Sequence, residues 1–447
     1  MKLPFERPLI KKINAGMPSK FGLRPTLKPI QNIDGVPVET LLEKYGSPLF
    51  VISEQTIRDV YRDAKQAFET RYPKVQFAWS YKTNYLDAVC RVFHEEGAWA
   101  EVVSGMEYDK ALRNGVSGSQ IIFNGPGKSR EDLKKAIRNG SLIHIDHFDE
   151  LFLLLELAQS SENKPKVAIR VNMDTGIYPK WDRFGFNYEN GEAWEALNRI
   201  MISGKLDLVG LHTHIGTYIM VTSAYRVAAT KLADLAYNVE RKFKHNIKYI
   251  DLGGGFASQN TLKGAYHSGL DTTPSFEDYA EAISGALVSS NLNPEKLPVL
   301  ILETGRALID EAGYLLGTVL ANKRLSDGRR TLIVDVGVNI LFTSFWYEHE
   351  IYPAKNTTEF TEETTIYGPL CMNIDVIRAA IDFPVLKAGE QFVIKRVGAY
   401  NMTQWMQFIH NRPAVVLVDT EGESHLIREK ETLDTIVQNE KLPEHLA

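Results

Sequence analysis

The chain has 447 residues, of which 44% are hydrophobic and 24% are charged, and its formal net charge at pH 7 is -5. A chain of this length and composition can bury a large core, which predicts a globular protein of two domains rather than a disordered one. Acidic and basic residues are interspersed, so the sequence offers no basic stripe for nucleic acid and no polybasic segment for a membrane surface. We therefore expect neither nucleic acid nor a membrane among its partners.

The amino-terminal segment 1–24 mixes Lys and Arg with Pro and contains no continuous apolar stretch. We interpret it as a surface arm rather than a signal peptide or a membrane anchor. The chain contains only two cysteines, Cys90 and Cys371, which argues against a disulfide framework. This cysteine usage is typical of a reducing compartment, so we expect a cytoplasmic protein.

From about residue 48 to about residue 305, short apolar runs alternate with amphipathic stretches, which is typical of parallel βα units. This rhythm over about 250 residues predicts an α/β fold, a (β/α)₈ TIM-like barrel, rather than an open doubly wound sheet. The expected strands are 49–52, 75–79, 121–123, 142–145, 167–171, 208–211, 249–250 and 299–302. The expected helices are 54–71, 130–139, 148–159, 224–242 and 276–292.

Beyond residue 305 the sequence becomes rich in short strands and turns, which predicts a second, mostly β domain. Its clearest strands are expected over 330–335, 391–394 and 414–418. We therefore expect three parts in the chain: an arm and a strand that contributes to the β domain (1–47), the barrel (48–305) and the C-terminal β domain (306–447).

The run FAWSYK, residues 77–82, resembles a strand and ends in Lys82. In a barrel enzyme the chemistry gathers at the carboxyl ends of the strands, where a lysine amine can form a Schiff base. Most lysines at strand ends are only solvated surface residues, so Lys82 alone leaves both interpretations open.

Two further strand ends carry groups that suit a phosphate and a flat ring. Three consecutive glycines, 253–255, let backbone N–H groups approach an anion, although a tight turn also needs glycine. After the strand 299–302, the guanidinium of Arg306 suits phosphate oxygens, and the carboxylate of Glu303 would keep a facing ring nitrogen protonated. A local ion pair at the surface is the alternative for these two residues.

His212 and His214 alternate along the strand that follows residue 208, so both side chains point to the same side. In the functional interpretation, one imidazole stacks on a cofactor face and Thr217 contacts a phosphate. In the alternative, each ring is a core histidine bonded to the backbone. The neighbouring sequence offers no third ligand for a metal, and we expect none.

The segment 368–375 places the thiol of Cys371 near the carboxyl group of Asp375, and Tyr400 follows two small residues. A thiol and an acid can serve proton transfer, and a phenol can contact a phosphate or a substrate. Taken singly, each of these residues also fits ordinary packing.

Together these positions resemble the fold-type III pyridoxal phosphate decarboxylases and, within them, the diaminopimelate decarboxylases. The resemblance extends from about residue 46 to residue 418, and the order of the motifs is specific although no single motif is. Segments 123–128 and 183–186 are also similar to segments of this family.

The resemblance implies pyridoxal 5′-phosphate as the cofactor and decarboxylation of an amino acid as the reaction. It makes Lys82 the residue that forms the Schiff base, His214 the stacking ring and Glu303 the partner of the pyridine nitrogen. It also implies a head-to-tail homodimer, in which Cys371, as candidate proton donor, and Asp375 reach into the barrel of the second subunit. The phosphate contacts that it implies are Thr217, Gly253, Gly254, Gly255, Arg306 and Tyr400.

The sequence departs from the diaminopimelate decarboxylases where the substrate is bound. Thr343 stands where they carry an arginine for a substrate carboxylate, and Met372 replaces the acid that meets the distal amine. A charged group left unpaired in a dry pocket is costly, so we predict a substrate other than diaminopimelate. The residues that indicate a larger or more apolar ligand are Trp346, Tyr347, Trp405 and Met406.

Three alternatives remain open from the sequence. An alanine-racemase-like enzyme shares the barrel and the lysine, but Glu303 argues against it because that family faces the ring nitrogen with arginine. A pyridoxal phosphate-binding protein without turnover would lack the long β domain. An unrelated barrel enzyme with a phosphate site is the third, since barrels host many chemistries.

Overall fold

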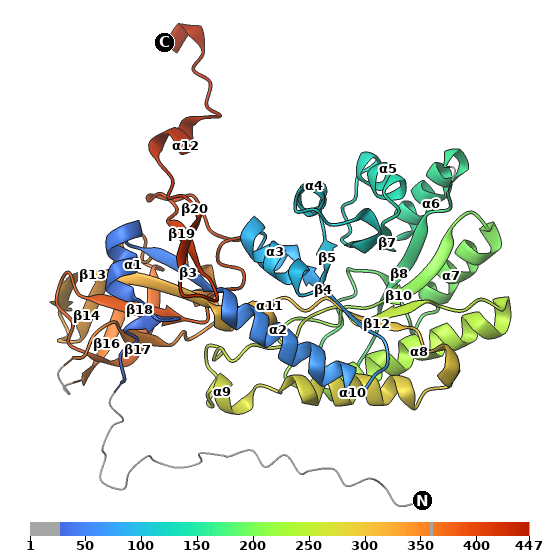
Figure 1. The fold of residues 1–447 in the computed structure, drawn as a ribbon, viewed down its shortest axis with the longest axis horizontal. Coiled ribbons are helices and arrows are strands. Elements are labelled where there is room, and N and C mark those ends of the chain that lie inside the picture. Colours follow the sequence, from blue (N-terminus) through green and yellow to red (C-terminus); the bar gives the residue numbers. More distant parts are fainter. Residues whose placement is uncertain (1–26, 162, 358–360, 447) are drawn as a thin grey trace, which may run out of the picture.

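The computed structural model describes residues 27–161, 163–357 and 361–446. The expected surface arm, residues 1–24, lies outside the described residues. Within the described part of the chain, no helix is both long and apolar enough to cross a membrane. Figure 1 shows the two parts of the molecule, a β-rich part at one end and a barrel with its helices at the other.

Eight parallel strands form the barrel, in the spatial order β10, β11, β12, β4, β5, β6, β7, β8, and pairing of β10 with β8 closes it. The fold class predicted from the sequence is therefore confirmed. The barrel strands are β4 (Val75–Ser80), β5 (Trp99–Val102), β6 (Ile121–Phe123), β7 (Leu142–Ile145), β8 (Lys166–Asn172), β10 (Asp207–His212), β11 (Tyr249–Asp251) and β12 (Val299–Leu302). A short strand, β9 (Phe186–Asn187), pairs with β8 outside this ring.

The predicted barrel strand over 49–52 is wrong, because β3 (Leu49–Ser53) pairs with β13 and β19 in the β-rich part. Phe50 and Ile52 enter one hydrophobic cluster, whereas Leu49 and Val51 enter another. A strand buried on both faces reads as a continuous apolar run wherever it lies, so its pattern cannot distinguish the two sheets. The true second strand of the barrel, β5, was missed because Glu101 interrupts its apolar run.

Helices cover the outside of the barrel. The five expected helices are present within a few residues of their predicted bounds, whereas α3, α4, α7 and the short α9 and α11 were not predicted. The helices of the barrel are α2 (Glu54–Glu69), α3 (Asp87–Glu95), α4 (Gly105–Arg113), α5 (Arg130–Arg138), α6 (Phe148–Leu157), α7 (Glu192–Ser203), α8 (Ser223–Phe243), α9 (Gly269–Thr272), α10 (Phe276–Val288) and α11 (Arg306–Ile309).

The β-rich part, here called the β domain, is organised around the long strand β13 (Gly313–Arg324), which pairs with β3, β14 and β18. The main path of its sheet runs β17, β16, β14, β13, β3, β19, β20. Its other strands are β14 (Arg330–Val334), β15 (Ile351–Pro353), β16 (Thr361–Tyr367), β17 (Val376–Pro384), β18 (Gln391–Lys395), β19 (Ala414–Val418) and β20 (Ser424–Arg428). The ribbon β1 (Asn32–Ile33) and β2 (Val36–Pro37), helix α1 (Val38–Tyr45) and helix α12 (Leu433–Val437) complete the described elements.

The barrel interior is layered. Alternate strand residues, among them Ala78, Ile122, Leu142, Ala168 and Ile301, form one apolar cluster. Because side chains alternate across a strand, the residues two positions further along point the same way. These are buried and polar: Ser80, Asn124, His144, Arg170 and Glu303. A polar layer therefore lies above an apolar one, toward the carboxyl ends of the strands, where barrel enzymes carry their sites.

Candidate active site

Lys82 lies on the short 3₁₀ turn Tyr81–Thr83 that directly follows β4. Its Nζ atom is 2.7 Å from Oε2 of Glu101, and the Ser80 hydroxyl donates to the same oxygen. Burial opposes the charge of Lys82, but Glu101, Tyr400 and Glu303 together outweigh it, so the pKa of Lys82 is raised. The lysine side chain is still 41% exposed because it faces a cavity.

This cavity, of about 130 Å³, brings together most of the site residues predicted from the sequence. Gly253 stands next to it, since a Cβ atom on this glycine would lie 2.8 Å from Nδ1 of His214. The residues that line the cavity are Ser80, Lys82, Trp181, His214, Thr217, Gly254, Gly255, Glu303, Gly305, Arg306 and Tyr400.

Arg306 lines the cavity at the start of α11. Aromatic rings surround its guanidinium, the nearest being Tyr400 at 4.6 Å, and the Tyr347 hydroxyl accepts a hydrogen bond from it. Arg306 is 9% exposed, and the hydrogen-bond partners of its guanidinium within the described residues are the hydroxyls of Tyr347 and Thr217 rather than a carboxylate. A buried guanidinium without a carboxylate partner suits a planar anion such as phosphate. The Thr217 hydroxyl, 3.5 Å away, adds a second polar group.

The glycine turn after β11 forms the wall beside this anion site. Gly253 and Gly255 adopt left-handed backbone angles, with φ of +66° and +96°. A Cβ atom on Gly254 would lie only 2.5 Å from the carbonyl oxygen of Glu303. The Gly254 N–H donates to Nδ1 of His214 at 3.1 Å, which leaves the ring proton on Nε2. Burial lowers the pKa of His214, so this ring is neutral and can lie against another flat ring.

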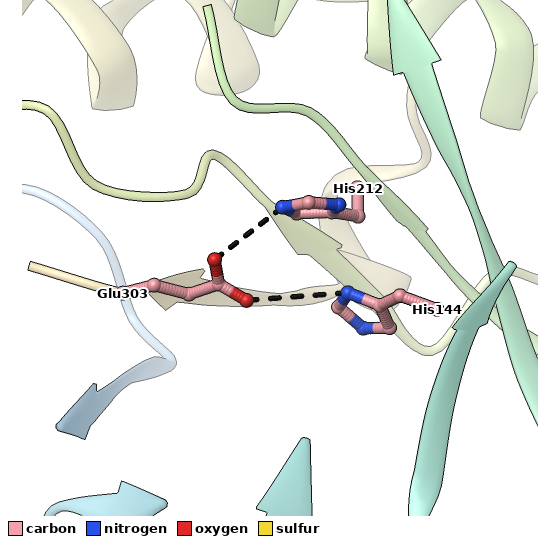
Figure 2. Close-up of side chains that lie close together, drawn as sticks. All are labelled: His144, His212 and Glu303. Carbon is pink, nitrogen blue, oxygen red and sulfur yellow. Dashed lines mark ion pairs between the residues drawn. The ribbon is translucent and has the colours of Figure 1, made fainter. Parts of the chain in front are cut away.

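Glu303 also lines the cavity, one residue beyond β12, and it is buried. Asn124 donates to Glu303 Oε1 at 2.6 Å and to Glu101 Oε1 at 3.1 Å, so one amide links the two carboxylates. Figure 2 shows two histidine rings reaching Glu303 from other strands: His212 Nε2 is 3.4 Å from Oε2, and His144 Nδ1 is 4.0 Å from Oε1.

Known proteins share this arrangement of sequence and fold. Residues 55–310 match the family described as "Pyridoxal-dependent decarboxylase, pyridoxal binding domain". The chain is 31% identical over 432 residues to the diaminopimelate decarboxylase of Methanocaldococcus jannaschii, covering 93% of this chain and 95% of that protein. It is 30% identical over 420 residues to the enzyme of Bacillus subtilis, covering 91% and 94%.

The chain belongs to the pyridoxal-dependent decarboxylases. A crystal structure of the M. jannaschii diaminopimelate decarboxylase superimposes with a TM-score of 0.86 and 29% identity, covering 94% of this chain and 99% of that one. This decarboxylase therefore uses pyridoxal 5′-phosphate and acts on an amino acid. The cavity fits that cofactor: an unpaired buried guanidinium and glycines that leave room beside it face a lysine amine and a buried carboxylate.

Cys371 and Asp375 of this decarboxylase do not line the cavity of their own chain. Cys371 is exposed on the β domain. Asp375 is buried in the same turn and accepts hydrogen bonds from the N–H groups of Val338 and Leu370, at 2.8 and 2.7 Å. The carboxylate of Asp375 therefore holds the turn that presents the thiol, and a substrate contact by either residue stays a prediction.

Thr343 is also away from the cavity: its hydroxyl is buried and bonded to His349 and Asn401. Tyr347 lies against Arg306, next to the cavity, through the hydrogen bond described above. Trp405 is partly buried and packs edge-on against Phe50, so its expected place at the substrate pocket also stays a prediction. Substrate contacts by Thr343 and Tyr347 stay predictions.

Several residues of the site were not predicted. Trp181 lines the cavity, with its ring 5.4 Å from that of His214. Glu101 was hidden in a strand that the apolar pattern missed. The residues next to His212 in the sequence include no third metal ligand. Closure of the barrel brings Glu303 and His144 within 4.8 Å of His212, with one ligand atom from each.

A larger cleft, of about 850 Å³, lies between α2 and α10 and does not include Lys82. Its buried charged groups have partners within the chain. Arg396 pairs with Glu311 and Glu350, and Asp310 accepts hydrogen bonds from Ser258 and Asn260. The small cavity, which is lined by Lys82 and by an arginine without a carboxylate partner, is the better candidate for the reaction.

Proposed function

We propose that Lys82, His214, Glu303 and Arg306 form the cofactor site of this amino-acid decarboxylase and that its substrate is not diaminopimelate. The observation that carries the assignment is that a lysine amine, a buried carboxylate and a guanidinium without an ion-pair partner line one cavity. Pyridoxal phosphate, when bound, supplies an electron sink for the bond that breaks.

Each residue then has a defined task in the reaction. The Lys82 amine binds the cofactor, and Glu101 takes or returns its proton across their 2.7 Å contact. Glu303 holds a proton at the ring nitrogen, because an adjacent anion favours the charged pyridinium. His214 supports the ring face, and the phosphate is held by Arg306 with the contacts Thr217, Gly253, Gly254, Gly255 and Tyr400.

We infer that the active unit is a head-to-tail homodimer. Its support is that Cys371 is exposed on the β domain, while the cavity of the same chain contains no thiol among its lining residues. In such a dimer Cys371 of the second subunit protonates the substrate carbon after carbon dioxide leaves. Asp375 holds the turn that carries this thiol.

The substrate proposal rests on the groups that would meet a charged side chain. No arginine stands at position 343, and the Thr343 hydroxyl already bonds to His349 and Asn401. The relatives named above are diaminopimelate decarboxylases. A site that leaves the distal charges of a diamino diacid unpaired rejects it, whereas Trp181 and Tyr347 suit a less charged amino-acid side chain.

We further infer a cytoplasmic location and no nucleic-acid partner. Both cysteines are free, Cys90 in the core and Cys371 at the surface. The net charge of -5 and the interspersed acids and bases disfavour binding to a polyanion.

The test is to incubate the purified protein, loaded with pyridoxal phosphate, with a panel of amino acids that includes diaminopimelate, ornithine, lysine and neutral members. Released carbon dioxide is measured and the amine is identified by mass spectrometry. We expect an amine product from an amino acid other than diaminopimelate. If diaminopimelate is turned over fastest, the substrate proposal is rejected. Exchange of the Cα hydrogen without carbon dioxide release would instead indicate a racemase.

A further inference from the structure

Two histidines lie beneath Glu303 in the polar layer of the barrel, and neither belongs to the tasks described above. His144 and His212 are each 1% exposed. Their ring centroids are 4.6 Å apart, and both rings face the Glu303 carboxylate from different strands, β7 and β10 (Figure 2). Three of their ring nitrogens have no hydrogen-bond partner within the described part of the chain: both nitrogens of His212, and Nδ1 of His144.

Unpartnered polar atoms this deeply buried are rare, because each loses its hydration without compensation. Their presence at one carboxylate calls for a function, since an apolar side chain would fill the same space at lower cost. The shared neighbour of both rings is Glu303, and the contact distances of 3.4 and 4.0 Å leave room for hydrogen bonds after small shifts.

We propose that His212 and His144 are positioning residues that donate hydrogen bonds to the Glu303 carboxylate and so fix its orientation toward the ring nitrogen of the cofactor. This inference rests on the proposed role of Glu303. Neutral rings suit the task because an N–H donor orients a carboxylate without cancelling its charge, whereas a second cation beside it would compete with the pyridinium.

The hydrogen bond on the far side of His144 determines which of its nitrogens carries the proton. His144 Nε2 is 2.9 Å from the Tyr249 hydroxyl. Burial keeps the pKa of Tyr249 well above its ordinary value, so the phenol keeps its proton, and among the described residues Nε2 of His144 is the one acceptor within hydrogen-bond distance of it. The remaining proton of the neutral imidazole is then on Nδ1, which faces Glu303. Tyr249 thus selects the tautomer that can donate to the carboxylate.

Burial also keeps both histidines neutral despite the carboxylates near them. The pKa of each ring is lowered well below its ordinary value, chiefly by burial. The charged groups around the pair are Lys82, Glu101, Lys128, Arg170 and Glu303. Burial and the adjacent charge of Glu303 also raise the pKa of Asp251 well above its ordinary value.

A bound metal ion is the competing explanation, because one atom from each of His144, His212 and Glu303 lies within 4.8 Å of the others. A zinc ion with bonds of about 2.1 Å holds its ligand atoms roughly 3.4 Å apart, so the contacts of 3.4 and 4.0 Å do not by themselves separate the two explanations. Two other contacts disfavour the metal: Glu303 Oε1 is already bonded to Asn124, and a proton on Nδ1 of His144 leaves that nitrogen no lone pair for a metal. The hydrogen-bonding role therefore fits better, and metal analysis separates the two.

The experiment is a double-mutant cycle on the holoenzyme with the variants H212N, H144N and E303Q and the corresponding double variants. We expect H212N and H144N each to lower kcat about 10- to 100-fold with KM little changed, since the histidines act on a group that the transition state needs. In the E303Q background the same substitutions should cost little more. A role in folding alone would give losses that add.

A spectroscopic readout accompanies the kinetics. The visible absorbance of the bound cofactor should shift in H212N in the same direction as in E303Q. Y249F tests the same chain of contacts with a variant that removes a single oxygen, and it should reproduce the H144N effect more weakly. H245N is the matched control, because His245 bonds to the Leu208 carbonyl, away from Glu303. It should change neither kcat nor the visible absorbance of the cofactor.

Additive losses, an unshifted spectrum in H212N and Y249F, or a metal ion bound in a 1:1 ratio to the wild-type protein would overturn the inference. Failure of the proposed function has a different signature. It is seen in the wild type itself, as the absence of a lysine-linked cofactor absorbance or of any amine product. The histidine variants can fail while the wild type meets both criteria.

Discussion

Lys82 and Ser80 share one oxygen of Glu101, so the amine is held by an anion before any cofactor arrives. We expect Lys82→Ala to abolish the visible absorbance of a lysine-linked cofactor and to lower carbon dioxide release roughly a thousandfold or more. The measurement is an absorption spectrum of the loaded protein together with a turnover assay. Lys134→Ala, at a surface lysine paired with Glu131, is the control. A retained chromophore in the Lys82 variant would contradict the assignment.

Glu107, close behind the site, makes stability depend on pH. Burial raises its pKa from 4.5 to about 7. The folded state therefore holds this proton more tightly than the unfolded state, so the contribution to stability is present below pH 4.5 and is lost as pH rises to 7. Glu107→Gln has no carboxyl group to titrate, so its free energy of unfolding should not fall in this way between pH 4.5 and pH 8. The difference in the free energy of unfolding between the variant and the wild type should therefore be larger at pH 8 than at pH 4.5, by as much as ~3 kcal/mol. Urea denaturation at the two pH values measures the difference, and an equal difference at both would refute it.

The turn after β11 acts as one element, because its three glycines pack against two neighbouring strand ends. In Gly254→Ala the new Cβ atom would lie 2.5 Å from a backbone oxygen, so the turn must move away from the cavity. We expect the dissociation constant for pyridoxal phosphate to rise at least about tenfold. Titration of the apo-protein, followed by visible absorbance, measures it. Gly127→Ala is the control, since nothing lies within 4 Å of its Cβ position. Equal affinities for pyridoxal phosphate in the two variants would contradict a role of the glycine turn in cofactor binding.

At the same scale, β3 and β5 explain where sequence patterns mislead. All five residues of β3 are buried, and a fully apolar run predicts a strand without naming its sheet. In β5 the apolar pattern is broken by Glu101. The desolvation cost of this buried carboxylate is offset by hydrogen bonds from Lys82, Ser80 and Asn124. The acid that hid the strand from the pattern is thus part of the site.

At the scale of the whole molecule, the cavity and Cys371 lie on different parts of one chain. If two subunits share their sites, a dimer of one Lys82→Ala and one Cys371→Ala subunit contains one intact site and one site that carries both changes. Random reassociation of the two inactive variants should then recover about a quarter of the wild-type activity. Activity after mixing, compared with each variant alone, is the measurement. No recovery, with dimers present by size-exclusion chromatography, would show that the sites are not shared.

The sequence by itself determined the alternation of strands and helices, the change to a β domain, and the types of group that follow each strand, because these depend on local spacing and side-chain chemistry. It thereby predicted Lys82, His214, Glu303 and Arg306 as candidates for one site, and the structure brings them around one cavity. Closure of the barrel decided which strand ends become neighbours. It placed Glu101 on Lys82, Asn124 between two carboxylates, and His144 beside His212. These contacts join residues far apart in the chain, so no local pattern encodes them, and only the register of the closed sheet sets their distances.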